Sequence, residues 1–283
     1  MAASDLSFSS IKRGSVRNEA EFGPFDIVGD VHGCFSELFR LLTRLGYRVE
    51  DGWVRGVAPG RRLVFLGDFW DRGPDGAAVL RLVADACLTG LALAIPGNRD
   101  IKLLRLMESG RVRRAPECAA LRATMSAAQL RAIGRFLASL PGHRVLDEGR
   151  LVVAHAGLPS QRQGDDSKDT WQRAVFGGAT GPPDPDGIPR RLAWARRYRG
   201  SALVVYGHTP LARPLRLGRT WGIDTGCVYG GALTALRYPE LEIVSVPAEG
   251  VHAKRARPLA EPTLVGEAEQ PDAEASSEPP RPA

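Results

Sequence analysis

The stretch "RLVFLGDFWDRG", residues 62–73, passes directly from an apolar segment into a cluster of charged residues. Its first part is the short continuous apolar run that is typical of a buried strand. Asp68, Asp71 and Arg72 follow at once, and Pro74 stands near the start of a segment with apolar residues at helical spacing. A strand that leads through a charged turn into a helix is one unit of an α/β fold.

The same unit is found on both sides of this stretch. Upstream, "FDIVGD" at residues 25–30 predicts a buried strand, and the amphipathic segment after it ends at Gly46. Downstream, "LALAIPGN" at residues 91–98 predicts a third strand, followed by a helix that begins around Asp100. Alternating strands and helices indicate an α/β fold with parallel strands.

The remainder of the chain divides into regions of different character. Residues 107–140 are rich in Ala and Arg and are predicted to be helical. The second half is richer in short apolar strands, namely "RLVVAHAG", "SALVVYGH", "TWGIDTG", "ALTALRY" and "LEIVSVP". A long irregular loop, of a length that is often functional, is expected at residues 177–189. We therefore expect a flexible segment at 1–22, one domain at 23–249 and a disordered Pro-, Glu- and Ser-rich tail at 250–283.

Composition places the chain among cytoplasmic enzymes or binding proteins. No signal peptide or membrane-spanning run is evident, which predicts no membrane association. The four cysteines are scattered without a C-x-x-C pair, and we interpret them as small hydrophobic residues. The net charge is +6, and nearly all the basic residues are arginines. That excess is consistent with a solvated arginine surface or with a surface that attracts phosphate.

Potential metal ligands follow strand after strand. Because ligands of α/β folds bind beyond the carboxyl ends of the strands, these side chains are expected at one edge of the fold. They are Asp30, His32, Asp68, Asn98, His155 and His208. The set is sufficient for two metal ions. Asp30, His32 and Asp68 are assigned to one ion, and Asp68, Asn98, His155 and His208 to the other, with the Asp68 carboxylate as the bridge.

Mixed imidazole and carboxylate ligands favour transition metals over the all-oxygen sites of Ca²⁺. We expect two divalent cations, with Mn²⁺ as the first choice and Ni²⁺, Fe or Zn²⁺ as alternatives. His143 and His252 fall outside the pattern and are assigned no role.

At this point the chain resembles the calcineurin-like metallophosphoesterase superfamily, whose blocks run G-D-x-H-G, G-D-x-x-D-R-G, G-N-H-D/E, a strand-end His, and G-H. The resemblance covers residues 25–247. Within the superfamily it is most similar to the phosphatase domain of bacterial polynucleotide kinase-phosphatase. This closer resemblance rests on "NRDIKLLRLM", "HRVLDEGRLVVAHAGL", "WARRYRGSALVVYGHTP" and "IDTGCVYGGALTALRYPELEIVSVPA". Diadenosine tetraphosphatases and PPP-type protein serine/threonine phosphatases share the short blocks.

The resemblance implies a four-layer αββα fold, with two central sheets between helices and a dimetal site at the strand ends. It implies that Arg72 binds phosphate, that Asp71 supports the site and that Asp224 is a further active-site residue. It also implies that Arg191 is a second phosphate contact, and Trp70 is expected to pack in the core. No G-x-x-x-x-G-K-[ST] loop is present, so the kinase half of such enzymes is missing from this chain.

Arg99 departs from the family pattern. The family places a histidine after the asparagine, where the aspartate of D-R-G holds it and it donates a proton to the leaving oxygen. Here Asp71 is present and position 99 is an arginine. We expect Arg99 to stabilise the departing oxygen by its charge, oriented by Asp71.

These residues indicate a phosphoesterase. A hydroxide bridging the two cations would attack phosphorus directly, while Arg72 neutralises the charge that develops. The expected substrates are phosphomonoesters at nucleic-acid 3′ ends, 2′,3′-cyclic phosphates, or nucleotides. The alternatives are a PPP-type protein phosphatase, a dinucleoside tetraphosphatase, or a degenerate member that binds phosphate without turnover because of Arg99.

Overall fold

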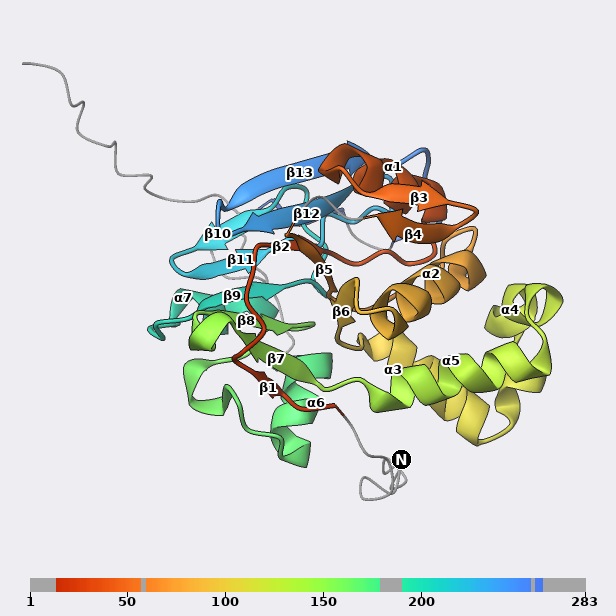
Figure 1. Ribbon diagram of the computed structural model, residues 1–283, viewed down its shortest axis with the longest axis horizontal. Coiled ribbons are helices and arrows are strands. Elements are labelled where there is room, and N and C mark those ends of the chain that lie inside the picture. Colours follow the sequence, from red (N-terminus) through yellow and green to blue (C-terminus); the bar gives the residue numbers. More distant parts are fainter. Residues whose placement is uncertain (1–13, 57–59, 179–189, 256–257, 262–283) are drawn as a thin grey trace, which may run out of the picture.

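The computed structural model describes residues 14–56, 60–178, 190–255 and 258–261 (Figure 1). Two large β-sheets form the centre of the molecule. The five-stranded sheet has the order β13 (Glu242–Pro247), β12 (Ala232–Tyr238), β2 (Phe25–Val28), β5 (Arg62–Phe65), β6 (Ala92–Ala94). The six-stranded sheet has the order β1 (Arg17–Asn18), β7 (His143–Leu146), β8 (Leu151–Ala154), β9 (Leu203–Tyr206), β11 (Thr220–Gly222), β10 (Leu215–Leu217). A small hairpin is formed by β3 (Arg48–Glu50) and β4 (Trp53–Gly56).

The strands at the centre of each sheet run parallel and end level with one another. In the five-stranded sheet Val28 is paired with Phe65, and Phe65 with Ala94. In the six-stranded sheet β8, β9 and β11 are also parallel. The loops after these strands therefore leave their sheets at the same edge, where α/β folds bind ligands.

The sheets pack face to face through a shared apolar core. Alternate residues of each strand point to opposite faces, so Phe25 and Ile27 face the other sheet while Val28 belongs to the outer core. Both faces are buried, which explains why the central strands read as unbroken apolar runs. The residues between the sheets are Phe25, Ile27, Val64, Leu66, Leu93, Ile95, Leu146, Leu151, Val153, Leu203, Val205, Ile223, Leu236 and Tyr238.

Helices cover the outer faces (Figure 1). The α-helices are α1 (Phe35–Leu45), α2 (Gly76–Leu88), α3 (Asn98–Glu108), α4 (Ala119–Thr124), α5 (Ala127–Ser139), α6 (Lys168–Phe176) and α7 (Ala193–Arg196). Short 3₁₀ helices are η1 (Arg111–Arg113), η2 (Pro116–Cys118), η3 (Asp147–Gly149), η4 (Ser160–Arg162) and η5 (Arg190–Leu192). Apolar residues of α1 and α2 share one core with the outer face of the five-stranded sheet. Trp194 of α7 packs on the outer side of the six-stranded sheet, against Tyr206 of β9. The expected four-layer αββα architecture is confirmed.

The structure differs from the sequence expectation at both ends of the domain. Residues 1–22 were expected to be flexible, yet Arg17–Asn18 forms β1 and pairs with β7, while residues 1–13 lie outside the described part. Part of the expected disordered tail also has a defined place, since Val251 bridges Tyr229 and Ala260 bridges Leu211. Residues 256–257 and 262–283 of that tail are not described, and neither are residues 179–189 of the expected long loop.

The helical region predicted at 107–140 is broken into shorter pieces. Gly110 ends α3 in a left-handed conformation with φ +67°, and a new helix begins at the Ser126 cap, whose hydroxyl accepts the Gln129 N–H. No helix in the described part of the chain is both long and apolar enough to span a membrane.

Candidate metal and phosphate site

The six predicted metal ligands meet where the two sheets end. Asp30 and His32 follow β2, Asp68 follows β5, Asn98 begins α3 after β6, His155 follows β8, and His208 follows β9. The first four come from the five-stranded sheet and the two remaining histidines come from the six-stranded sheet. Ligand atoms of Asp30, Asp68 and His155 all lie within 4.8 Å of one another and are buried.

Four of these side chains form a tight polar cluster. His155 Nε2 lies 3.2 Å from Asn98 Oδ1 and 3.6 Å from Asp68 Oδ1. His208 Nδ1 lies 3.0 Å from Asn98 Oδ1 and 3.1 Å from His155 Nε2. His155 Nδ1 is 4.0 Å from Asp30 Oδ1, which joins this cluster to the loop after β2.

His32 faces the other oxygen of Asp68. Its Nε2 lies 3.4 Å from Asp68 Oδ2, and its Nδ1 lies 2.6 Å from Asp71 Oδ1. The carboxylate of Asp71 accepts the Nδ1 proton, so in the neutral ring the lone pair is on Nε2. A histidine held in this way by a carboxylate is a common arrangement at metal sites.

The local backbone at the site is unusual. Non-glycine residues rarely adopt positive φ, but His32 has φ +48°, Asp68 +54°, Arg72 +72° and His208 +68°. Each such residue costs on the order of 1–3 kcal/mol, so the surrounding structure must hold it.

Asp100 supplies much of that support. Its carboxylate accepts the backbone N–H groups of Asp68 (2.7 Å), Phe69 (2.9 Å) and Gly97 (2.8 Å), which binds the loop after β5 to the start of α3. Nothing in the sequence pattern assigned Asp100 a role, although it is the last residue of the "GNRD" block. Its importance became visible only through its three backbone partners.

The electrostatics of the site favour a cation. Burial, together with the charges of Asp224 and Asp68, raises the pKa of Asp30 well above its ordinary value. Burial also raises the pKa of Asp224. Several carboxylates are therefore crowded in a buried space where their negative charges repel each other, and a bound cation would offset this repulsion.

The hydrogen-bond chemistry fits divalent metal ions as well. His155 Nδ1 lies 2.8 Å from the carbonyl oxygen of Leu66, which can only accept a proton. The neutral ring therefore has its lone pair on Nε2, facing the acceptor oxygens of Asn98 and Asp68. Burial, with the charge of Arg191, lowers the pKa of His208, so this imidazole is neutral. Imidazole nitrogens and carboxylate and amide oxygens that converge in this way are a donor set for a cation.

Arg99 lies against Asp71. Its Nε is 2.7 Å from Asp71 Oδ2, and its backbone N–H donates to Asp68 Oδ1 at 2.8 Å. Burial alone would raise the pKa of Asp71, but the hydrogen bond with His32 and the charges of Arg72 and Arg99 hold that pKa below its ordinary value. Asp71 therefore stays ionised and orients both guanidinium groups.

Arg72 and Trp70 lie in the same loop, between β5 and α2. Arg72 Nη1 lies 3.1 Å from His32 Nε2, and its guanidinium stacks 5.5 Å from the ring centroid of Tyr229. Nothing in the sequence signalled this role of Tyr229. Trp70 is buried as expected, and its indole N–H also donates to the carbonyl of Arg99 at 2.9 Å.

The two remaining predicted residues differ in how closely they approach the ligands. Asp224 follows β11, is buried, and accepts the Gly226 N–H at 3.0 Å. It lies near enough to raise the pKa of Asp30. Arg191 in η5 is exposed, and its influence on the pKa of His208 places it within electrostatic range of the cluster.

Gly207 offers a test of the packing around Asp30. A Cβ at position 207 would overlap Asp30 Oδ1, so we expect Gly207→Ala to displace that carboxylate and weaken metal binding by about 10- to 100-fold. Metal titration by calorimetry measures the effect. Gly250→Ala is the matched control, because a Cβ there meets no atom within 4 Å. Equal affinity in the two variants would show that Asp30 does not need its present position.

The family model described as calcineurin-like phosphoesterase matches residues 23–244. An asymmetrical bis(5′-nucleosyl)-tetraphosphatase PrpE of Geobacillus thermodenitrificans is 43% identical over 237 residues, covering 80% of this chain and 95% of the relative. The PrpE of Bacillus subtilis is 40% identical over 230 residues, covering 79% and 94%.

The fold of the chain is also similar to that of solved structures. A crystal structure described as a "putative diadenosine tetraphosphatase" aligns with a TM-score of 0.63 and 28% identity, covering 84% of this chain and all of that one. A protein serine/threonine phosphatase from Saccharomyces cerevisiae aligns with a TM-score of 0.55 at 15% identity, which shows the shared fold alone. The chain therefore belongs to the calcineurin-like phosphoesterase family and is a metal-dependent phosphatase.

Proposed function

We propose that the chain hydrolyses dinucleoside polyphosphates, cleaving a phosphoanhydride bond so that a nucleotide is the leaving group. The observation that carries this proposal is the Arg99–Asp71 ion pair, at the position where the family places a proton-donating histidine. A guanidinium keeps its proton at neutral pH, so Arg99 cannot act as a general acid. The chemistry that suits such a site is one whose leaving group departs without a proton.

Leaving-group chemistry separates the substrate classes. A nucleotide phosphate leaves as a stable anion, whereas a ribose or serine hydroxyl needs a proton as its bond to phosphorus breaks. The names of the relatives support the same choice, since they are tetraphosphatases of bis(5′-nucleosyl) compounds. This is one of the alternatives from the sequence analysis. We favour a dinucleoside polyphosphate as the substrate over a phosphomonoester on a nucleic-acid end, which the sequence first favoured.

Two divalent cations, Mn²⁺ first among them, would be held by the six ligands described above, would lower the pKa of a water that attacks phosphorus, and would offset phosphate charge. The chain's own residues orient the ligands and bind the phosphate oxygens. Asp71 keeps the His32 ring oriented with its Nε2 lone pair toward Asp68. Arg72 and Arg99, each about three-quarters buried beside Asp71, present planar donors to the phosphate oxygens. Arg99 stabilises the departing phosphate by its charge.

A substrate panel tests this function. With Mn²⁺ present, we expect kcat/KM for diadenosine tetraphosphate to exceed that for a 3′-phosphorylated oligonucleotide, a 2′,3′-cyclic nucleotide and a phosphoserine peptide. The difference should be about 10²-fold or more, because the absence of a general acid slows the reaction of substrates with an alcohol leaving group by about this factor. A preference for the oligonucleotide would instead support action on nucleic-acid ends, and a preference for the peptide a protein phosphatase. Failure on every substrate with metal bound would indicate the degenerate, phosphate-binding member.

A further inference from the structure

A second group of metal-ligating side chains lies apart from the six residues assigned above. It consists of Cys34, Glu37 and Cys227, which are 0%, 1% and 2% exposed. One ligand atom from each lies within 4.8 Å of the others. Cys34 precedes α1, Glu37 lies in the first turn of α1, and Cys227 lies in the turn after β11. The spacing of the cysteines along the chain shows no pair, which favoured their interpretation as small hydrophobic residues.

The Glu37 carboxylate has one oxygen that nothing satisfies. Its Oε1 accepts the backbone N–H of Glu249 at 3.0 Å and lies 3.1 Å from His252 Nε2. Its Oε2 has no hydrogen-bond partner within the described part of the chain, although the residue is almost fully buried. A buried acceptor without a partner is costly, and more so when it is charged.

The Glu37 carboxylate stands beside the two sulfur atoms. A disulfide between the two cysteines would leave Glu37 Oε2 without a partner, whereas a cation would satisfy it.

We propose that Cys34, Cys227 and Glu37 bind one thiophilic divalent cation, Zn²⁺. Two thiolate sulfurs and a carboxylate oxygen are ligands that Zn²⁺ accepts, with a water completing four-coordination. Binding would release the two thiol protons to solvent. His252 donates its Nε2–H to Glu37 Oε1 and so leaves Oε2 for the metal.

This site would join three parts of the chain that surround the catalytic cluster. Cys34 follows His32 by two positions, and Cys227 follows Asp224 by three. His252 belongs to the C-terminal segment, which is held to the same turn because its backbone N–H donates to the Val228 carbonyl at 3.0 Å. A cation here would hold the turns that carry His32 and Asp224 at fixed positions. It is a positioning site, and none of its ligands is assigned to substrate.

Cobalt substitution tests the site selectively. Full-length protein, purified without oxygen and stripped of metal with a chelator, would be titrated with Co²⁺. Sulfur ligands give Co²⁺ an intense near-ultraviolet charge-transfer absorption. The six ligands of the catalytic cluster include no sulfur, so this absorption reports only on the cysteine site. We expect it to saturate at one equivalent per chain and to disappear on addition of Zn²⁺.

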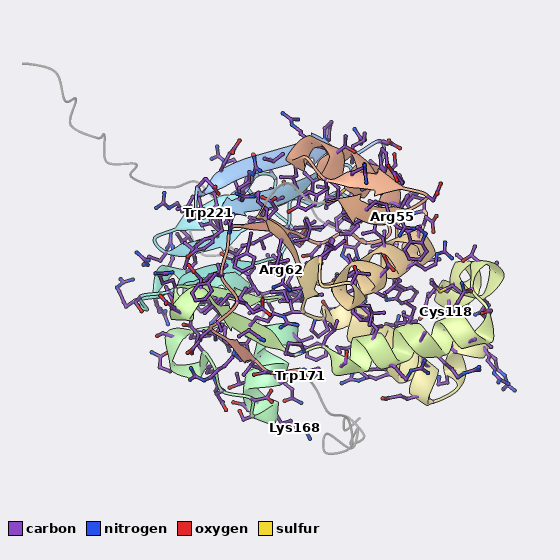
Figure 2. All side chains as sticks on the ribbon, in the orientation of Figure 1. Arg55, Arg62, Cys118, Lys168, Trp171 and Trp221 are labelled. Atoms are coloured by element: carbon purple, nitrogen blue, oxygen red, sulfur yellow. The ribbon has the colours of Figure 1, made fainter. Side chains whose placement is uncertain are left out.

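Variants identify the ligands. Cys34→Ser and Cys227→Ser should each remove about half of the absorption, because one sulfur ligand remains, and the double variant should abolish it. Glu37→Gln should weaken Co²⁺ binding, and His252→Ala should weaken it by about 10- to 100-fold. The matched controls are Cys87→Ser and Cys118→Ser, which remove cysteines outside the cluster and should leave the absorption unchanged. Figure 2 shows Cys118 in the part of the molecule built from α4 and α5. Circular dichroism would report whether each variant is folded.

Three results would overturn the proposal. They are the absence of sulfur-to-cobalt absorption in the wild type, its persistence at full intensity in the Cys34→Ser or Cys227→Ser protein, and a Cys34–Cys227 disulfide found by mass spectrometry in the oxygen-free preparation. If a cysteine variant does not fold, Glu37→Gln decides, because it removes the charge without changing the shape of the side chain. Unchanged Co²⁺ affinity in Glu37→Gln would exclude Glu37 as a ligand and with it the proposed site.

Discussion

Asp68→Ala should lose both catalytic cations and reduce kcat/KM by about 10³-fold or more. The two oxygens of Asp68 face histidines that come from different sheets, since Oδ2 lies 3.4 Å from His32 Nε2 and Oδ1 lies 3.6 Å from His155 Nε2. The charge stabilisation that metal ions supply is worth several kcal/mol. A loss of about 4 kcal/mol corresponds to about three factors of ten in rate.

Elemental analysis and steady-state kinetics on the same preparation check this expectation. Asp85→Ala, on the partly exposed side of α2, is the control and should keep both the metal content and the activity. Asp68→Asn preserves shape and removes charge, so it separates metal binding from local folding. Two ions retained by Asp68→Ala would remove the assignment of Asp68 as the bridge.

Arg99→His should change which leaving groups the enzyme tolerates. The Asp71 carboxylate, 2.7 Å from Arg99 Nε, is placed to hold an imidazole at position 99, and an imidazole can donate a proton where a guanidinium cannot. A positioned general acid contributes about 10²–10⁴-fold. We expect the wild type to hydrolyse p-nitrophenyl phosphate much faster than an alkyl phosphomonoester, and Arg99→His to narrow that ratio by about 10²-fold.

The ratio of the two kcat/KM values is the measurement, because it cancels differences in metal content. Arg105→His is the control. Arg105 lies later on the same helix, where its guanidinium stacks 5.6 Å from the ring centroid of Phe176, and its replacement should leave the ratio unchanged. An unchanged ratio in Arg99→His with both cations bound would show that position 99 does not face the leaving group.

The sequence predicted the α/β architecture and brought six candidate ligands to one place for a single physical reason. Each apolar run ends in a polar turn, and parallel strands that end level bring their turns together. The pairing of Val28 with Phe65 and of Phe65 with Ala94 shows that alignment. The assignment of these residues to metal remains a prediction that the Asp68 variants test.

Other features depended on contacts between residues that lie far apart in the chain. The bond between Glu37 and His252 joins positions separated by 215 residues, and neither residue carries a local signal. The pairing of Arg17–Asn18 with β7 was missed for the same reason, because a strand of two residues has no measurable periodicity. The breaks within residues 107–140 depend on single turn residues such as Gly110, whose effect a helical composition conceals.

The origin of the ligands in both sheets has a consequence for the order in which the chain folds. The backbone of His208 donates to the Asp30 carboxylate across 178 positions, so this part of the site closes only after most of the domain has been synthesised and collapsed. Contacts of such long range form slowly, because the entropy of closing the loop must be lost before they stabilise the fold. A nascent chain that ends before His155 can offer a cation only Asp30, His32, Asp68 and Asn98. If these residues bind metal, as proposed, capture at the complete cluster is a late event and marks chains in which the two sheets have docked.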